Sequence, residues 1–284
     1  MLHSEKKTYR ITEERIRRFG ESLRQREYCQ GTVENYVRSV RAFQTWCRGC
    51  FGRAQVLAWK AHLTGRSAPA TVNAMLAGIN CFFRAQGWED CAVKPLRIQR
   101  RAFSPPERQL NRDEYVRLVR AARTAGNERL ALVMETICAT GIRVGEVGYI
   151  TWEAARAGRA EVFLKGKIRM ILIPGALCRK LLRYARTRNI TSGGIFRTKS
   201  GRPLSRTQIW AEMKKLCRRA GVGERKTFPH NLRHLFAKTF YTLYKDVVRL
   251  ADILGHSSIN TTRIYLISDG TEHVRQLERM HLLC

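Results

Sequence analysis

The sequence predicts a mainly α-helical protein of two domains with one small β-hairpin. Three observations lead to this fold class. Apolar residues recur at helical spacing along most of the 284-residue chain. One stretch, residues 161–174, instead shows two apolar runs around a short glycine-containing turn. An arginine- and proline-rich stretch, RIQRRAFSPPER at residues 97–108, separates two parts that are each long enough to form a core.

The first 98 residues contain four amphipathic stripes and predict a compact four-helix bundle without strands. Thr12 is placed to cap the first helix, and Pro69 and Gly87 bound the fourth. The apolar positions of the four stripes are Ile16, Phe19, Leu23; Val33, Tyr36, Val37, Val40, Phe43; Val56, Leu57, Leu63; and Val72, Met75, Leu76, Ile79, Phe82, Phe83.

The second part begins after a basic, proline-containing linker at residues 99–108. Asn111 followed by Glu114 predicts a capping box at the start of a helix. Further helices are predicted by the apolar segment 130–138 and by the stripes at 176–185, 205–222, 231–244 and 246–255.

The charge of the chain is far from balanced. It has 53 Lys and Arg against 23 Asp and Glu, a formal charge of +30. The first 108 residues carry +11 and the remainder +19. Such an excess of one sign repels itself unless a polyanion offsets it, so nucleic acid is the expected partner and both parts are expected to touch it.

Other classes of protein are disfavoured. No run of 18 apolar residues is present, and the N-terminal sequence is charged, so a membrane-spanning or secreted protein is not expected. Nine cysteines without a signal peptide indicate a reducing compartment, the cytoplasm. Cys47 and Cys50 form a CxxC, but no second ligand pair follows, so they are interpreted as small apolar residues and no metal is expected.

Five short motifs in the second part carry candidate chemistry. They are Arg143 in ATGIRVGE, Lys165 and Lys167 in LKGKIR, His230 and Arg233 in HNLRH, His256 in LGHSS, and Tyr265 in RIY. Attack on a phosphodiester concentrates negative charge on its oxygens, and guanidinium groups are well suited to bind that charge. A tyrosine can attack phosphorus if a base takes its proton. His230 lies three residues before Arg233, so a helix would present both on one face.

The order and spacing of these motifs resemble the tyrosine recombinase (phage integrase) family, of the Xer-like or mobile-element kind. His256 follows Arg233 by 23 positions, and Tyr265 follows His256 by nine. The resemblance extends from Leu110 to Leu266, and before that it is one of architecture only.

The resemblance implies a role for each matching residue. Arg143 and Arg233 would bind the phosphate, and Tyr265 would attack it to leave a 3′-phosphotyrosyl end. His230 would handle the tyrosine proton, and His256 would donate a hydrogen bond to the phosphate. No metal or other cofactor is implied, because the phosphotyrosine ester conserves the energy of the broken bond.

The lysine that protonates the departing 5′ oxygen in the family is harder to assign. The family commonly reads GKGxKxR, whereas this chain reads LKGKIRM with a shorter turn. Lys165 is favoured because it ends the first strand, as the family lysine does, and Lys167 is the alternative. Glu146 has two interpretations, one as a residue that orients Arg143 and one as a helix-surface acid. His234, Tyr241 and Tyr244 are predicted to be structural.

The resemblance also implies an architecture and partners. The fold would be a two-domain clamp, with a four-helix, SAM-like core-binding domain at residues 1–98 and a catalytic domain at 109–284. The partner would be double-stranded DNA with inverted-repeat core sites, bound by a homodimer and synapsed by a homotetramer. A C-terminal helix with Val274, Leu277 and Met280 on one face would dock onto a neighbouring protomer, although packing within the chain fits equally well.

Two other functions share these features. A type IB topoisomerase-like enzyme has the same constellation but is disfavoured by the size and the compact N-terminal part. A catalytically silent DNA-binding module is disfavoured because all five motifs are present. The sequence does not distinguish integration and excision of a mobile element from resolution of chromosome or plasmid dimers.

Overall fold

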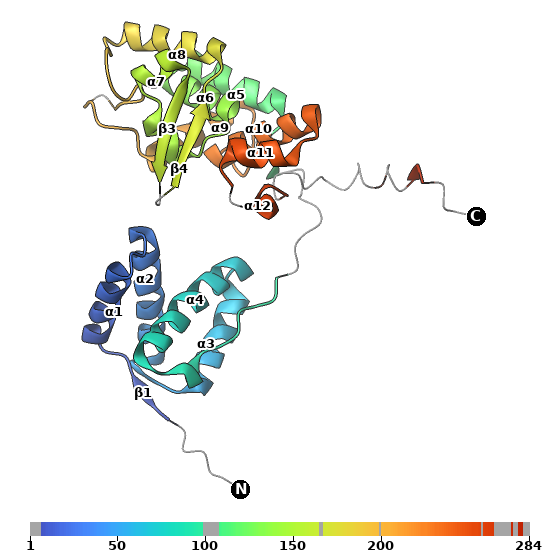
Figure 1. The fold of residues 1–284 in the computed structure, drawn as a ribbon. Coiled ribbons are helices and arrows are strands. Elements are labelled where there is room, and N and C mark those ends of the chain that lie inside the picture. The colour runs from blue at the N-terminus through green and yellow to red at the C-terminus, as the bar shows by residue number, and fades with distance from the viewer. Residues whose placement is uncertain are drawn as a thin grey trace. The chain divides into compact units, whose positions relative to one another are not determined.

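The structure is a computed structural model of the 284-residue chain, and it describes residues 7–98, 108–164, 167–198, 200–256, 258–263, 274 and 278–280. The chain divides into two compact units, residues 1–100 and 101–284. The predicted linker at 99–108 lies outside the described residues except for its last residue, and the predicted C-terminal helix lies largely outside them. The mainly α fold predicted from the sequence is confirmed (Figure 1).

The first unit is a bundle of four helices with a short β-ribbon. Thr12 caps the first helix by accepting a hydrogen bond from the backbone N–H of Arg15 at 3.3 Å, and Pro69 begins the fourth, as predicted. The elements are β1 (Tyr9–Arg10), α1 (Glu13–Gln25), α2 (Gln30–Cys47), β2 (Cys50–Phe51), α3 (Arg53–Arg66), α4 (Pro69–Gln86) and the 3-10 turn η1 (Glu89–Cys91).

Two details of the predicted bundle were wrong. The antiparallel pair β1–β2 was not expected, because two-residue strands are too short to show an alternating pattern. Leu57 was assigned to the core but is 47% exposed, while Trp59 of the same helix is 2% exposed and fills the inner face. The bulky indole was the better core candidate of the two, although both fit a helical stripe.

The second unit surrounds the buried helix α6 (Glu128–Thr140), which contacts α5 (Arg112–Thr124), α8 (Gly175–Thr187), α9 (Arg206–Ala220) and α10 (Pro229–Tyr244). The predicted capping box of α5 is confirmed, with Asn111 and Glu114 each accepting from the other's backbone N–H. The remaining helical elements are η3 (Val144–Tyr149), α7 (Trp152–Ala157), α11 (Val247–Leu254) and α12 (Ile259–Arg263).

The predicted hairpin is also present in this unit. Strands β3 (Arg159–Leu164) and β4 (Lys167–Leu172) pair antiparallel, from Arg159 opposite Leu172 to Leu164 opposite Lys167. One face of the hairpin is buried and includes Val162 and Ile171, whereas the opposite face exposes several apolar side chains. These exposed residues are Phe163, Ile168, Met170 and Leu172.

Every helix in the described part of the chain is too short or too polar to span a lipid bilayer.

Candidate active site

Arg143 lies in the turn between α6 and η3. Gly141 ends α6 in the left-handed conformation, with φ +65°, and turns the chain toward Arg143. The Arg143 side chain is 45% exposed, and its Nη1 donates to Oε1 of Glu146 at 3.0 Å. One edge of the guanidinium is therefore fixed while much of it faces solvent, where a phosphate has access.

Glu146 is one of the most deeply buried charged groups of the unit, with 2% of its side chain exposed. Its Oε2 accepts from the backbone N–H of Arg143 at 2.8 Å and from Nη2 of Arg169 at 2.8 Å. The two arginines compensate for the loss of water around the carboxylate. Of the two interpretations of Glu146, the structure supports the one in which it orients Arg143.

Arg233 is almost completely buried, at 1% exposure. Its Nη1 donates to the carbonyl of Gly141 at 2.6 Å, and its Nη2 donates to the carbonyl of Leu254 at 2.9 Å. Nη2 also lies 2.8 Å from Nε2 of His256. Arg233 thus joins the end of α6, where Arg143 follows, to the end of α11, where His256 follows.

The tautomer of His256 follows from its partners. A guanidinium has no acceptor, so Nε2 of His256 accepts from Arg233, and Nδ1 carries the proton. That proton is then donated to Oγ1 of Thr262, 2.9 Å away. Burial, followed by the positive charges of Arg233 and Arg143, lowers the His256 pKa to about 4, so the ring is neutral at pH 7.

His230 is the second residue of α10, after Pro229 in the first turn. Its ring reaches solvent, yet surrounding protein atoms desolvate it, and this effect together with Arg233 and Arg143 lowers its pKa. The ring of His234, one turn later, meets that of His230 edge to face at 4.9 Å. His234 is more deeply buried, and this burial lowers its pKa to about 4.

Two of the predicted catalytic residues lie outside the described residues. These are Tyr265 and Lys165, and the side chain of Lys167 is also not described. The backbone leads to both positions: β3 ends at Leu164, and α12 ends at Arg263.

Four of the predicted residues are brought together by this arrangement. Arg143, His230, Arg233 and His256 come from three segments that are distant in sequence, and hydrogen bonds from Arg233 to the carbonyls of Gly141 and Leu254 connect all three. Both Arg143 and Arg233 lower the pKa of His230 and of His256, so the four side chains share one electrostatic neighbourhood. The fixed charge is positive, as a site for a phosphodiester requires.

The phage integrase family model matches residues 108–272, which is more than half of the chain. This chain belongs to the phage integrase family. The match includes all five motifs.

Two curated relatives show how the similarity is distributed. Tyrosine recombinase XerA of Thermococcus kodakarensis is 27% identical over 257 residues, covering 87% of this chain and 88% of that protein. Tyrosine recombinase XerH of Campylobacter jejuni is 35% identical over 149 residues, covering 50% of this chain and 42% of that protein. The first alignment includes most of both proteins.

Solved structures of family members share the fold. A lambda integrase dimer bound to a COC' core site matches with a TM-score of 0.73 at 20% identity, covering 93% of this chain and 79% of that chain. XerH bound to its difH substrate before cleavage matches with a TM-score of 0.68 at 18% identity, covering 90% of this chain and 82% of that one.

Sequence reasoning missed two residues of this site. Thr262 is fully buried and accepts a hydrogen bond from Nδ1 of His256, but a threonine on a short helix carries no signal that distinguishes it. Arg169 also lacked a signal in the sequence. Its neighbours Ile168 and Met170 are apolar, so the pattern of β4 alone would place Arg169 on the exposed face, whereas the structure buries its phase at Ile171.

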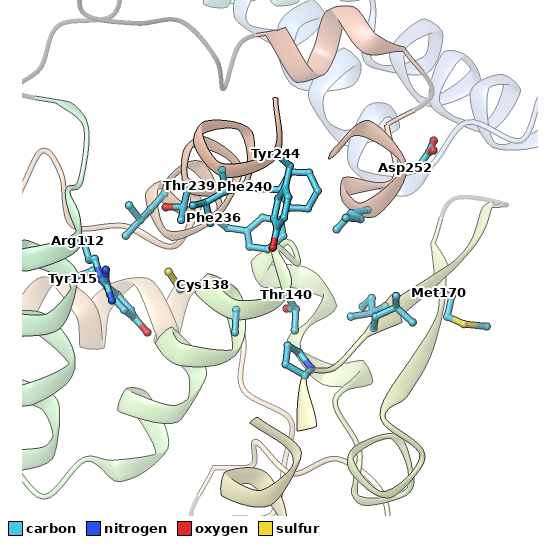
Figure 2. A pocket seen from close by; sticks show the side chains of 17 residues that line it. Arg112, Tyr115, Cys138, Thr140, Met170, Phe236, Thr239, Phe240, Tyr244 and Asp252 are labelled. Carbon is cyan, nitrogen blue, oxygen red and sulfur yellow. The ribbon is translucent and has the colours of Figure 1, made fainter. Parts of the chain in front are cut away.

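An apolar groove of about 860 Å³ lies beside this site in the second unit. Figure 2 shows Phe236, Phe240 and Tyr244 of α10 along it, with Met170 of β4 also lining it. The exposed apolar side chains Met170, Leu172 and Tyr244 contribute to its lining. Among the described residues, none of the predicted catalytic side chains lines this groove, so it is a separate surface.

Proposed function

We propose that this member of the phage integrase family is a site-specific DNA recombinase that cuts and rejoins DNA strands through a 3′-phosphotyrosyl intermediate at Tyr265. The observation that supports it best is the position of the buried Arg233. It lies beside His256 and donates a hydrogen bond to the carbonyl of Gly141, in the turn that carries Arg143. Two guanidinium groups that can bind phosphate oxygens and two neutral imidazoles that can exchange protons suit phosphoryl transfer.

The proposed reaction is a reversible exchange of ester bonds. The Tyr265 oxygen attacks the phosphorus, and its proton passes to His230. The bond from phosphorus to the 5′ oxygen breaks, and Lys165, or Lys167 in the alternative assignment, protonates that oxygen. A 5′ hydroxyl from the partner duplex then gives its proton to the lysine and attacks the phosphotyrosine, and His230 returns a proton to the departing Tyr265 oxygen.

The environment of His230 supports its role as proton acceptor. Burial and the nearby arginines lower its pKa below the ordinary 6.5, so at pH 7 the imidazole is neutral and has a nitrogen lone pair to offer. In the free protein both ring nitrogens of His256 have protein partners. A hydrogen bond from His256 to the phosphate would therefore require one of these contacts to be exchanged.

The partner we propose is double-stranded DNA with inverted core sites, bound by a homodimer and synapsed by a homotetramer, and the compartment is the cytoplasm. The charge of +30, spread over both units, supports extensive phosphate contact. Mobile-element integration or excision and dimer resolution both fit this function. A topoisomerase-like activity would need only one DNA site, and recombinase activity would need two.

The test is covalent capture. A duplex with a nick beside the cleavage position is incubated with the wild type and with Tyr265→Phe, and the products are separated under denaturing conditions. The substrate is taken from a DNA library or from sequence flanking the gene. We expect a slowly migrating adduct for the wild type and none for the variant. Tight binding to a verified site without any adduct would favour the silent DNA-binding module.

We also propose that the C-terminal segment, residues 269–284, docks in the apolar groove of a neighbouring copy. Its apolar residues Val274, Leu277 and Met280 match the apolar lining around Phe240 and Tyr244. A chain that ends at residue 268 is then expected to bind a single core site but not to cleave in a synapse. Mixing it with full-length Tyr265→Phe should restore cleavage if docking occurs in trans, and should not if the segment packs within its own chain.

A further inference from the structure

Arg169 is a charged residue in the interior of the second unit. It lies in the middle of β4, opposite Val162 of β3, and its side chain is 14% exposed. Its neighbours Ile168 and Met170 point to the exposed face of the hairpin, so Arg169 points inward. A cation placed there is costly unless specific partners compensate for the lost water.

The partners of Arg169 come from two separate segments. Nη2 donates to Oε2 of Glu146 at 2.8 Å, and Nη1 donates to the carbonyl of Ile253 at 3.2 Å. Nε is buried and has no acceptor within the described part of the chain. Two nitrogens of one planar group therefore bridge η3 to the last turn of α11.

The contact with α11 is suited to a guanidinium in charge as well as in shape. The last carbonyls of a helix lack partners within the helix and carry the negative end of its dipole. In α11 two successive carbonyls are satisfied by arginines, that of Ile253 by Arg169 and that of Leu254 by Arg233.

Arg169 also packs against the residue that precedes His256. Gly255 has φ +64°, and a Cβ built on it would lie 2.5 Å from Cδ and 2.8 Å from Nη1 of Arg169. The close approach of the arginine therefore requires glycine at this position. His256 follows Gly255 directly in the chain, so this contact lies next to the backbone of His256.

We propose that Arg169 is a positioning residue, which holds the turn of Arg143, the turn of His256 and the lysine-bearing hairpin in one fixed arrangement. It reaches Arg143 through Glu146, because both arginines bind the same carboxylate. It acts on His256 through its hydrogen bond to the Ile253 carbonyl and its packing against Gly255, which precedes His256. The inference rests on the proposed function, since it assigns these segments to one catalytic site.

The chemistry of the side chain gives the test. Lysine keeps the charge but is a single point donor, so it can bind Glu146 or the Ile253 carbonyl in place of Arg169 and not both in the same geometry. Arg169→Lys is compared with Arg159→Lys, the same change at an exposed position of the same hairpin. If Arg169→Lys does not fold at the assay temperature, Arg169→Gln replaces it, since glutamine buries no charge.

Three quantities are measured on the full chain. These are the single-turnover rate of cleavage on the nicked duplex, the dissociation constant for that DNA, and the NMR signals of the His256 ring in histidine-labelled protein. We expect the cleavage rate of Arg169→Lys to fall about 10- to 100-fold, as small misplacements of catalytic groups do. The dissociation constant should stay within about twofold, because only 14% of the Arg169 side chain is exposed and its guanidinium is engaged within the unit. Arg159→Lys should match the wild type in all three quantities.

The NMR signals separate positioning from general destabilisation. We expect the His256 ring signals to move in Arg169→Lys, where the charge is kept, and to stay in place in Arg159→Lys. Cleavage within twofold of the wild type, or unchanged His256 signals, would overturn the inference.

The same design separates this inference from the proposed function. If the wild type binds a verified site but forms no adduct, the proposed function fails, and the His256 signals alone decide whether Arg169 fixes that turn. If the wild type forms the adduct and Arg169→Lys forms it equally fast, only the positioning role fails.

Discussion

Arg233 shows how a single residue can serve both the fold and the site. A guanidinium at 1% exposure must have its donors satisfied, and the carbonyls of Gly141 and Leu254 with the ring of His256 do so. Since the fold itself requires this geometry, the charge is in place before any DNA binds. Such preorganisation is what makes electrostatic stabilisation effective.

We expect Arg233→Lys to reduce both cleavage and stability. A lysine cannot keep the three contacts at once, so adduct formation should slow by about 100-fold or more. The free energy of unfolding should fall by about 1–3 kcal/mol because buried carbonyls lose a donor. The measurements are single-turnover cleavage and urea unfolding, with Arg183→Lys on the exposed side of α8 as the matched control. Equal cleavage rates for the two variants would contradict this account of Arg233.

The histidines predict a pH dependence of stability. Burial lowers the pKa of His234 and of His256 to about 4, below the ordinary 6.5 of the unfolded chain. Between these values the unfolded state binds more protons, so stability is fully present above pH 6.5 and falls as the pH drops toward 4. The slope is at most about 1.4 kcal/mol per pH unit for each group.

Urea unfolding at pH 6.5 and pH 5 measures this effect above the range in which most carboxylates titrate. We expect the wild type to lose stability between these pH values and His234→Gln to lose less. A loss of the same size in both proteins would show that His234 is not held neutral by the fold.

At this scale the sequence indicated four side chains that the structure brings together, and their catalytic roles stay predictions. Arg143, His230, Arg233 and His256 stand in motifs whose spacing can be recognised without a structure. The role of Arg169 depends on contacts with Glu146 and Ile253, which lie 23 and 84 residues away in the chain. No local pattern reports such contacts. Tyr265 and Lys165 stay predictions.

At the scale of elements, the glycine that ends α6 allows this helix to pack closely against α10, and the glycine that ends α9 serves as a comparison. Gly141 and Gly221 both end helices with positive φ, +65° and +60°. A Cβ on Gly141 would lie 2.5 Å from Cδ1 of Phe236, whereas a Cβ on Gly221 would meet nothing within 4 Å. The close packing of α6 against α10 brings the Gly141 carbonyl to Arg233.

Alanine substitutions at Gly141 and Gly221 make a controlled comparison of their effects on the free energy of unfolding. We expect Gly221→Ala to cost about 1–2 kcal/mol, the penalty of a left-handed alanine. Gly141→Ala should cost a further amount of about 1–3 kcal/mol because Phe236 must move. Urea unfolding measures both, and an equal cost for the two would mean that the Phe236 contact adds nothing.

Most helices could be predicted because their stripes and caps are local. The β1–β2 ribbon was missed since two-residue strands form only through contacts between residues 9–10 and 50–51. Leu57 and Trp59 were both compatible with a helical stripe, and tertiary packing decided which of them is buried. In β4 the phase of Ile168, Met170 and Leu172 is entirely apolar, yet it is the exposed one, and the phase of Arg169 and Ile171 faces inward, so local apolar pattern would have favoured the wrong face.

At the scale of the whole molecule, charge is the dominant property. A formal charge of +30 divided between two units favours binding through many phosphate contacts. Most of that binding carries no sequence information, because sequence is read by contacts to base edges.

We therefore expect a steep dependence of DNA affinity on salt. Between 50 mM and 200 mM salt the association constant should fall by about 10³-fold or more, as for proteins that make several phosphate contacts. Titration of a labelled duplex at a series of salt concentrations measures the slope. A nearly flat dependence would mean that the positive charge does not serve DNA binding.

The most direct test of the central claim is to locate the covalent bond. The adduct formed with the nicked duplex is digested with nuclease and trypsin, and the peptide that carries a nucleotide is identified by mass spectrometry. Cleavage after Arg263 and Arg275 gives a peptide whose one tyrosine is Tyr265, while Tyr241 and Tyr244 fall together in residues 239–245. The account predicts the nucleotide on the 264–275 peptide. A nucleotide on the 239–245 peptide would contradict it, because the attacking group would then come from α10.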